Sequence, residues 1–200
     1  MQDDDGPALF HLIASELLSS NWPESLHDEI CESVNLRLDS VEIDMARARA
    51  RAADETDTEG QRRRDPKFRE LVLRAYERQC AMCGWDGQLD ASTVGLEAAH
   101  VKWWAFDGPD EIQNGLCLCS MHHRLFDKGA IGVSKDHRVA VSERFVGRGP
   151  TAEAFVLSRN GTKLLRPQRS EYEPLPEYLA WHHDEVFREP ERQQRGDSGA

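Results

Sequence analysis

The 200-residue sequence lacks any long hydrophobic run. No apolar stretch approaches the roughly 18 residues that a membrane-spanning helix needs, so we expect no such helix. The first residues, Met1 to Gly6, are acidic and lack the basic segment of a secretory signal. We therefore predict a cytoplasmic protein. In that reducing compartment the five cysteines are better explained as metal ligands or packing groups than as disulfides.

The sequence also lacks an excess of positive charge, since its net charge is −11. An acidic protein repels phosphate at long range, which counts against a large non-specific nucleic-acid surface. Basic residues are nevertheless concentrated within residues 62–78, while much of the acid lies at 3–5, 24–59 and 171–191. This split allows a local cationic face, although a basic run of this kind is more often a solvated helix face.

Large apolar side chains are missing from residues 46–60, which read A-R-A-R-A-R-A-A-D-E-T-D-T-E-G. Such a charged stretch is typical of a linker, because it cannot bury enough apolar surface to fold. Before it, apolar residues recur at helical spacing over residues 8–20 and about 23–36, which predicts a small helical pair. We divide the chain into a helical segment (1–43), a linker (44–64), a main domain (65–188) and a disordered polar tail (189–200).

Within the main domain, helical and strand-like patterns alternate, which predicts an α+β fold. The apolar stripe from Phe68 to Tyr76 predicts a helix, and Ser120 to Lys128 predicts a second, short one. Strands are expected around residues 88–89, 93–102, 131–133 and 138–146, and a final helix at about 177–188.

The main domain contains two close pairs of soft metal ligands. Cys80 and Cys83 stand at x2 spacing, and Cys119 and His122 form a second x2 pair about forty residues later. This is the layout of a structural zinc site, which is tetrahedral and closed. Cys117 competes as a ligand because it lies two residues from Cys119, and we interpret it as a packing residue.

Three polar residues in the same stretch remain to be explained: His100, Asn114 and His123. His123 follows His122 and projects about 100° away around a helix, so it cannot readily share the zinc. Asp127 lies four residues after His123, on the same helix face. A strand His, a loop Asn and a helix His beside a zinc knuckle together resemble the HNH nucleases of the ββα-metal type.

This resemblance implies a small zinc-bound ββα-metal core, treble-clef-like, with flanking helices. It implies that His100 is the general base that activates water, and that Asn114 orients it or the metal site. It also implies that His123 holds one divalent cation, Mg²⁺, Mn²⁺, Co²⁺ or Ni²⁺, with Asp127 as a helper. Many members carry Asp or His just before the base, whereas here that position is Ala99, which leaves the ligands of the cation open.

Longer runs resemble a narrower group of enzymes. The runs G-L-E-A-A-H-V-K-W, N-G-L-C-L-C-S-M-H-H-R-L-F-D-K-G-A and P-E-Y-L-A-W-H look like the nuclease half of bacterial phosphorothioate-dependent restriction endonucleases. In that group a sulfur-binding domain precedes the HNH domain. The helical pair, with N-W-P-E-S-L-H-D-E-I, is similar to the last helices of that recognition domain, so residues 1–43 are a candidate remnant of it.

Two functions follow from these patterns. The resemblance implies a metal-dependent DNA endonuclease, of restriction type, that defends against foreign or modified DNA. A one-site nuclease that cuts both strands would suggest a homodimer. The alternative is a zinc-stabilised nucleic-acid-binding or adaptor module without catalysis, which Ala99 and the acidic net charge favour.

Overall fold

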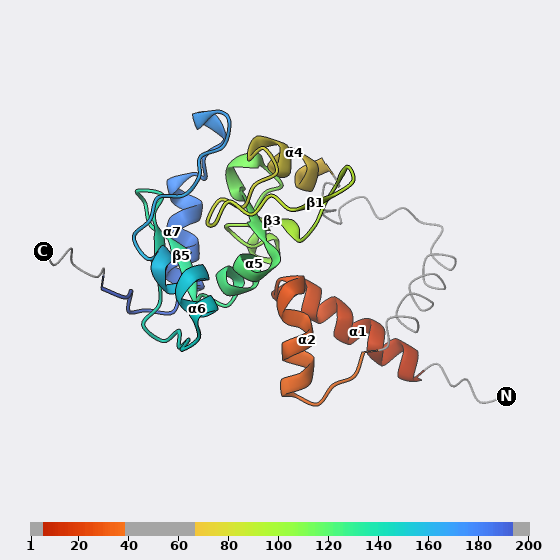
Figure 1. Ribbon diagram of the computed structural model, residues 1–200. Helices are drawn as coiled ribbons and strands as arrows, with labels where there is room; N and C mark the ends of the chain where they lie inside the picture. The colour runs from red at the N-terminus through yellow and green to blue at the C-terminus, as the bar shows by residue number, and fades with distance from the viewer. Residues whose placement is uncertain (1–5, 39–66, 194–200) are drawn as a thin grey trace, which may run out of the picture. The chain divides into compact units, whose positions relative to one another are not determined.

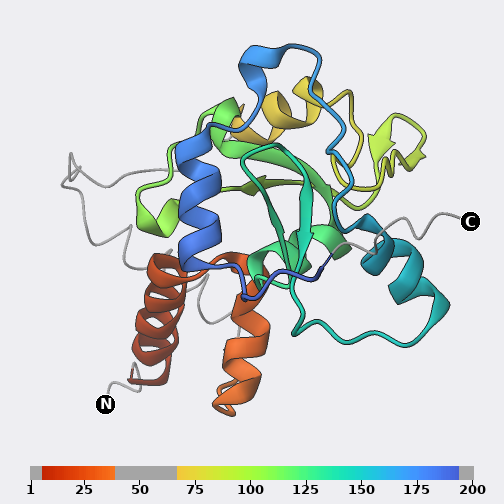
Figure 2. The same cartoon turned by 90° about the vertical axis from the view of Figure 1, so that its left-hand side faces the viewer.

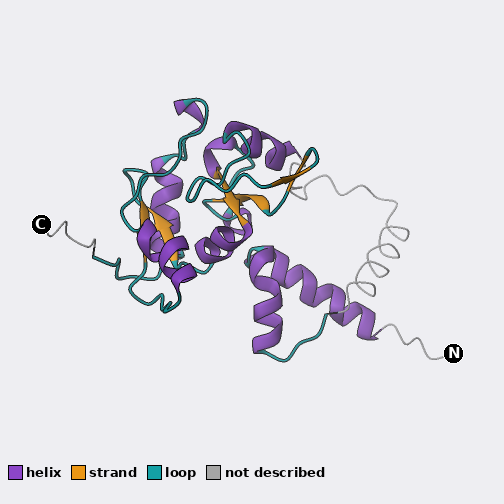
Figure 3. Ribbon diagram, viewed as in Figure 1, coloured by secondary structure: helices purple, strands orange, loops and turns teal. Residues whose placement is uncertain are grey.

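The computed structural model describes residues 6–38 and 67–193, and the predicted linker at 44–64 lies outside them (Figure 1). The chain divides into two compact units, Met1–Arg63 and Arg64–Ala200. The described part of the first unit is helical, whereas the second combines helices with short strands (Figure 3). None of the helices in the described ranges is both long enough and apolar enough to span a membrane.

The first unit contains α1 (Gly6–Asn21) and α2 (Glu24–Ser33), which contact each other. The Asn21 side-chain amide donates to Leu17 O at 2.8 Å and so closes the last turn of α1. Pro23 then stands directly before α2 in an extended conformation, where its fixed φ suits a helix start. Leu18 is buried in this unit.

The centre of the second unit is a hairpin-like pair of strands covered by two helices. β3 (Leu96–His100) pairs antiparallel with β4 (Gly115–Cys119), with His100 opposite Gly115. α4 (Lys67–Ala75) contacts both strands, and α5 (Ser120–Asp127) follows β4 directly. A Cβ at Gly115 would lie 2.4 Å from the Val72 side chain, so glycine is what lets α4 approach β4 this closely. Two strands followed by a helix make a ββα core.

Smaller elements surround this core (Figure 2). β1 (Gln88–Leu89) pairs with β2 (Ser92–Thr93), and β5 (Ile131–Val133) pairs with β6 (Val139–Val141), both antiparallel. Two α-helices follow, α6 (Pro150–Phe155) and α7 (Pro176–Glu185). Short 3-10 helices lie at Trp104–Phe106, Ile112–Asn114, Leu157–Arg159 and Ser170–Tyr172. The predicted α+β class with a ββα-metal core is confirmed.

Two predicted elements differ from the structure near the C-terminal end. The strand expected over 138–146 ends at Val141, because the Ser142 hydroxyl accepts from Arg144 N and turns the chain. The sequence predicts a disordered tail from residue 189, yet Glu191 bridges to Ser142 and Arg192 N donates to Val141 O at 2.7 Å. The backbone of these residues is paired along β6, so ordered structure extends beyond residue 188. Residues 194–200 lie outside the described part.

α7 holds the end of α5 in place. The His182 ring stacks on the Phe126 ring with centroids 3.6 Å apart, and its Nε2 donates to Phe126 O at 3.0 Å. After α7, Arg188 N donates to Gly129 O at 2.9 Å. Burial is the largest cause that lowers the pKa of His182, to about 3, so the ring is neutral in the folded protein.

Candidate functional site

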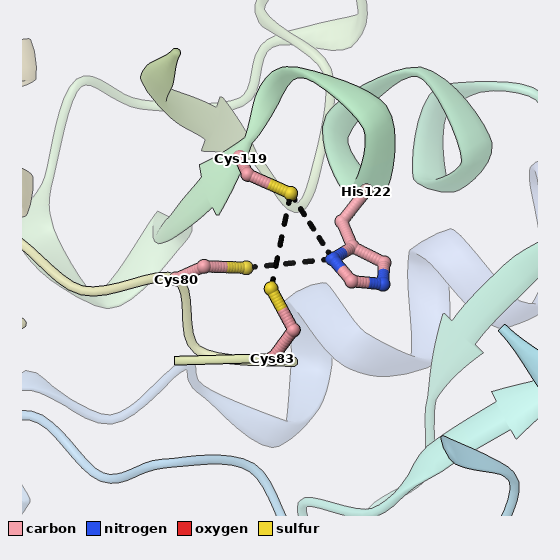
Figure 4. Close-up of side chains that lie close together, drawn as sticks. All are labelled: Cys80, Cys83, Cys119 and His122. Atoms are coloured by element: carbon pink, nitrogen blue, oxygen red, sulfur yellow. Dashed lines mark hydrogen bonds between the residues drawn. The ribbon is translucent and has the colours of Figure 1, made fainter. Parts of the chain in front are cut away.

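Two cysteines from a knuckle and two residues at the junction of β4 and α5 converge on one point (Figure 4). Cys80 and Cys83 come from the turn after α4, while Cys119 ends β4 and His122 lies in the first turn of α5. Their ligand atoms all lie within 4.8 Å of one another, and this group could hold a metal ion. Three of the four residues are buried, as a closed structural site requires.

The distances between these atoms can be tested against tetrahedral zinc. With Zn–S bonds of about 2.3 Å and Zn–N bonds of about 2.0 Å, the edges of the tetrahedron are about 3.8 Å between sulfurs and about 3.5 Å between sulfur and nitrogen. The Cys83 and Cys119 sulfurs are 3.9 Å apart. His122 Nδ1 is 3.5 Å from the Cys80 sulfur and 3.2 Å from the Cys119 sulfur. The four residues therefore fit a tetrahedral ion of this size.

The partners of these groups suit metal binding. His122 Nε2 donates to Phe155 O at 2.9 Å, which leaves the lone pair on Nδ1, the nitrogen that faces the sulfurs. Hydrogen bonds from Cys119 and then Cys83 lower the pKa of the Cys80 thiol, which favours the metal-binding thiolate. Burial disfavours a charged His122, but hydrogen bonds to Cys119 and Cys80 outweigh it and raise its pKa to about 10. That proton must leave when metal binds.

Cys117, the competing ligand, lies outside this group. It is fully buried in the middle of β4, and its carbonyl accepts from Ala81 N at 2.7 Å. Burial is the largest cause that raises the pKa of its thiol, to about 12, which favours the neutral form. These observations agree with a packing residue.

His123 turns away from this cluster and lies between two carboxylates. Its Nδ1 is 2.5 Å from a Glu97 oxygen of β3, and its Nε2 is 3.4 Å from an Asp127 oxygen of α5. Ser120 donates to the other Glu97 oxygen at 2.7 Å and so fixes that carboxylate. Burial disfavours a charged His123, but the Glu97 hydrogen bond and the Asp127 charge raise its pKa above the ordinary value. The hydrogen bond from His123 correspondingly lowers the pKa of Glu97.

The position of Glu97 bears on the metal ligand that is missing at position 99. Glu97 and Ala99 lie on the same face of β3, since alternate residues of a strand share a face. Ala99 is buried and offers no ligand. Glu97, two residues earlier, brings a carboxylate to Nδ1 of the helix histidine, while Asp127 lies at Nε2 on the other side of the ring.

His100 ends β3 and is held on two sides. Its ring stacks on Phe68 of α4, with centroids 4.1 Å apart and planes 15° apart. Its Nε2 lies 2.7 Å from an Asp110 oxygen, and the two side chains are only 18% and 13% exposed. The histidine is therefore restrained in orientation yet reachable from solvent.

Asn114 is fully buried at the end of the 3-10 helix Ile112–Asn114, and it ties together the loop that connects β3 to this helix. Its side-chain oxygen accepts from Lys102 N at 2.8 Å. Its amide nitrogen donates to Lys102 O and to Pro109 O, each at 2.9 Å. The two ends of the loop are thus joined through one side chain, directly beside Asp110.

The structure brings the sequence-predicted residues to neighbouring elements, with His122 and His123 on two sides of α5 and His100 at the end of the adjoining strand. Sequence reasoning missed the contacts of two acidic residues. Glu97 shares a strand face with Ala99, which indicates a carboxylate near that position but not its contact with His123. Asp110 lies ten residues from its partner in an irregular loop, and no spacing rule indicates it.

A family comparison agrees with this geometry, since residues 80–134 match a family model described as HNH endonuclease. A solved structure described as a modification-dependent TagI restriction endonuclease aligns with a TM-score of 0.47 at 20% sequence identity, and the match covers 70% of this chain and 43% of that chain. The chain thus spans less than half the length of that structure. The search of curated proteins gave no match.

Proposed function

We propose that residues 80–134, which match a family model described as HNH endonuclease, form a nuclease domain that hydrolyses phosphodiester bonds of DNA with the help of a divalent cation. The proposal rests on the contact between β3 and α5. These elements present a restrained histidine, His100, and a carboxylate-flanked histidine, His123, beside a separate four-ligand cluster.

His100 is the general base in this proposal. Its imidazole takes one proton from a water molecule, the water oxygen bonds to phosphorus, and the bond from phosphorus to the leaving oxygen breaks. Solvent water returns a proton to that oxygen. An imidazole suits this role because its ordinary pKa lies near physiological pH.

His123 is the proposed ligand of the cation, with Asp127 as a helper and Glu97, at the other nitrogen of the ring, as a further carboxylate nearby. When bound there, a divalent cation supplies charge stabilisation for the phosphate and the leaving oxygen. Ser120 orients Glu97, and the side chain of Asp127 is almost fully buried against the His123 ring. Mg²⁺, Mn²⁺, Co²⁺ and Ni²⁺ remain the candidates, since a mixed nitrogen and oxygen donor set accepts each of them.

Zinc is the proposed occupant of the cluster of three cysteines and one histidine, with a structural role. A set of three thiolates and one imidazole leaves no open position for water, so the cluster joins the knuckle to α5 and takes no part in the reaction. The cluster thereby fixes the helix from which His123 projects.

A restriction role and a homodimer extend the proposal. The restriction role is supported by the sequence runs that resemble phosphorothioate-dependent enzymes. Comparing cleavage of phosphorothioated and plain DNA tests it, and sedimentation of the full chain on a DNA duplex tests the dimer.

A plasmid-nicking assay with each of the four cations tests the nuclease proposal. His100→Ala should lower the rate by about 10²–10⁴-fold, the usual contribution of a general base. Glu97→Gln should raise the cation concentration needed for half-maximal rate. His183→Ala is the matched control, because this half-buried histidine of α7 forms its ion pairs with Asp184 and Glu189 and not with His100 or His123.

Two results would count against the proposal. Full activity in His100→Ala would remove the assignment of the base. DNA binding without cleavage under every cation would instead favour the adaptor module. Zinc content and thermal melting of each variant should match the wild type, so that a loss of rate is not a loss of fold.

A further inference from the structure

We propose that Asp110 is a positioning residue that sets the tautomer and orientation of His100, so that Nδ1 carries the lone pair which accepts the proton from water. This inference rests on the proposed nuclease function. It adds a residue that neither the sequence resemblance nor the family description assigns.

The hydrogen bond between the two side chains sets the tautomer. An ionised carboxylate can only accept hydrogen bonds, so the His100 nitrogen 2.7 Å from Asp110 Oδ1 must carry the proton. That nitrogen is Nε2, and in a neutral imidazole the lone pair then belongs to Nδ1. The contact is largely shielded, with the Asp110 side chain 13% exposed, so water competes weakly for it.

The orientation of the ring follows from two restraints of different kinds. Phe68, which is buried in α4, stacks against one face of the ring and limits its tilt. Asp110 holds the edge and limits rotation within the ring plane. A histidine restrained at face and edge needs little reorganisation before reaction, and misplacement of a catalytic group by about 1 Å can cost about 100-fold in rate.

The loop that carries Asp110 is itself fixed by Asn114. The Asn114 amide donates to Pro109 O, the carbonyl directly before Asp110, and its other contacts hold Lys102 at the opposite end of the loop. Asn114 therefore fixes the position of Asp110, the residue that contacts His100. A carboxylate beside the ring also favours the positive charge that develops on His100 as it takes the proton.

The test uses the full chain loaded with zinc and the variant Asp110→Asn. The amide has the same shape, but it can accept from Nε2 or donate to it, so the bias between tautomers is lost. We expect kcat for DNA cleavage to fall by about 100-fold with unchanged KM. Asp110→Glu should restore part of the loss, because it returns a carboxylate to the loop.

The matched control is Asp107→Asn, which makes the same change on the same loop. Asp107 is exposed and has φ 61°, a left-handed conformation that asparagine also tolerates. It should keep wild-type kcat. A double-mutant cycle gives the sharper readout: in the His100→Ala background Asp110→Asn should have no further effect, because Asp110 acts only through His100. An equal loss in both backgrounds would overturn the proposal.

Nitrogen NMR of the His100 ring provides a readout that needs no activity. The signals are assigned by their absence from His100→Ala. The wild type should show the Nε2-protonated tautomer, and Asp110→Asn should show a mixture. A wild type with the proton on Nδ1 would refute the assignment. If the tautomer is as expected but no cation supports cleavage, the nuclease proposal fails while the positioning contact stands.

Discussion

Replacing Asn114 by alanine should destabilise the protein more than an ordinary surface substitution. The side chain is fully buried and makes three hydrogen bonds, all to the backbone of the loop at Lys102 and Pro109. A hydrogen bond contributes about 1 kcal/mol net, which gives about 3 kcal/mol for the three. Lys102 and Pro109 are half-buried, so water can reach part of the freed backbone and the loss should not greatly exceed this figure.

Urea unfolding of the zinc-loaded chain, followed by circular dichroism, measures this loss. The midpoint should fall while the slope with denaturant stays the same, because the surface exposed on unfolding is unchanged. For a domain of this size, 3 kcal/mol corresponds to a fall in Tm of about 6–12 °C. Asn114→Asp should be worse than alanine, since a carboxylate oxygen would then face the carbonyls of Lys102 and Pro109.

Asn160→Ala separates general stability from the catalytic loop. Asn160 accepts from Val141 N at 2.9 Å and donates to Arg192 O at 2.8 Å, so its loss should cost about 2 kcal/mol. We expect this control to retain wild-type kcat, whereas Asn114→Ala releases the segment that bears Asp110 and should lower kcat. A destabilisation below about 1 kcal/mol in Asn114→Ala, or equal kcat in the two variants, would refute the reasoning.

Three further changes test other parts of the structure. Zinc removal by a chelator, or Cys83→Ser, should abolish the cooperative unfolding transition of the second unit in a calorimetric scan. The reason is that the knuckle and α5 are joined through the cluster. A chelated protein that melts as before would contradict this. The pKa of His182 is lowered in the fold from 6.5 to about 3, so its contribution to stability is present above pH 6.5 and is lost as the pH falls toward 3. His182→Gln should therefore show a flatter decline than the wild type in urea melts from about pH 7 to about pH 5, and parallel curves would argue against the buried neutral ring. Gly129→Ala should lower Tm strongly, since its φ is +68° and a Cβ would lie 2.0 Å from Val186 O; an unchanged Tm would mean that this contact relaxes at little cost.

The sequence by itself determined the features that depend on local spacing. The Cys-x2-Cys and Cys-x2-His pairs each place two ligands on one turn, so the four-ligand group could be predicted from the spacing of its members. Helix geometry alone likewise makes the adjacent side chains of His122 and His123 point in different directions. The α+β class followed from the periods of the apolar residues in the same way.

Only the tertiary structure decided which partners those residues have. Glu97 reaches His123 across the junction of β3 and α5, and Asp110 reaches His100 from an irregular loop, so both contacts depend on how segments distant in the chain pack. The partners of Asn114 are backbone groups, which no side-chain pattern reveals. Spacing fixes directions within one element, whereas contacts between elements follow from the packing of the whole core.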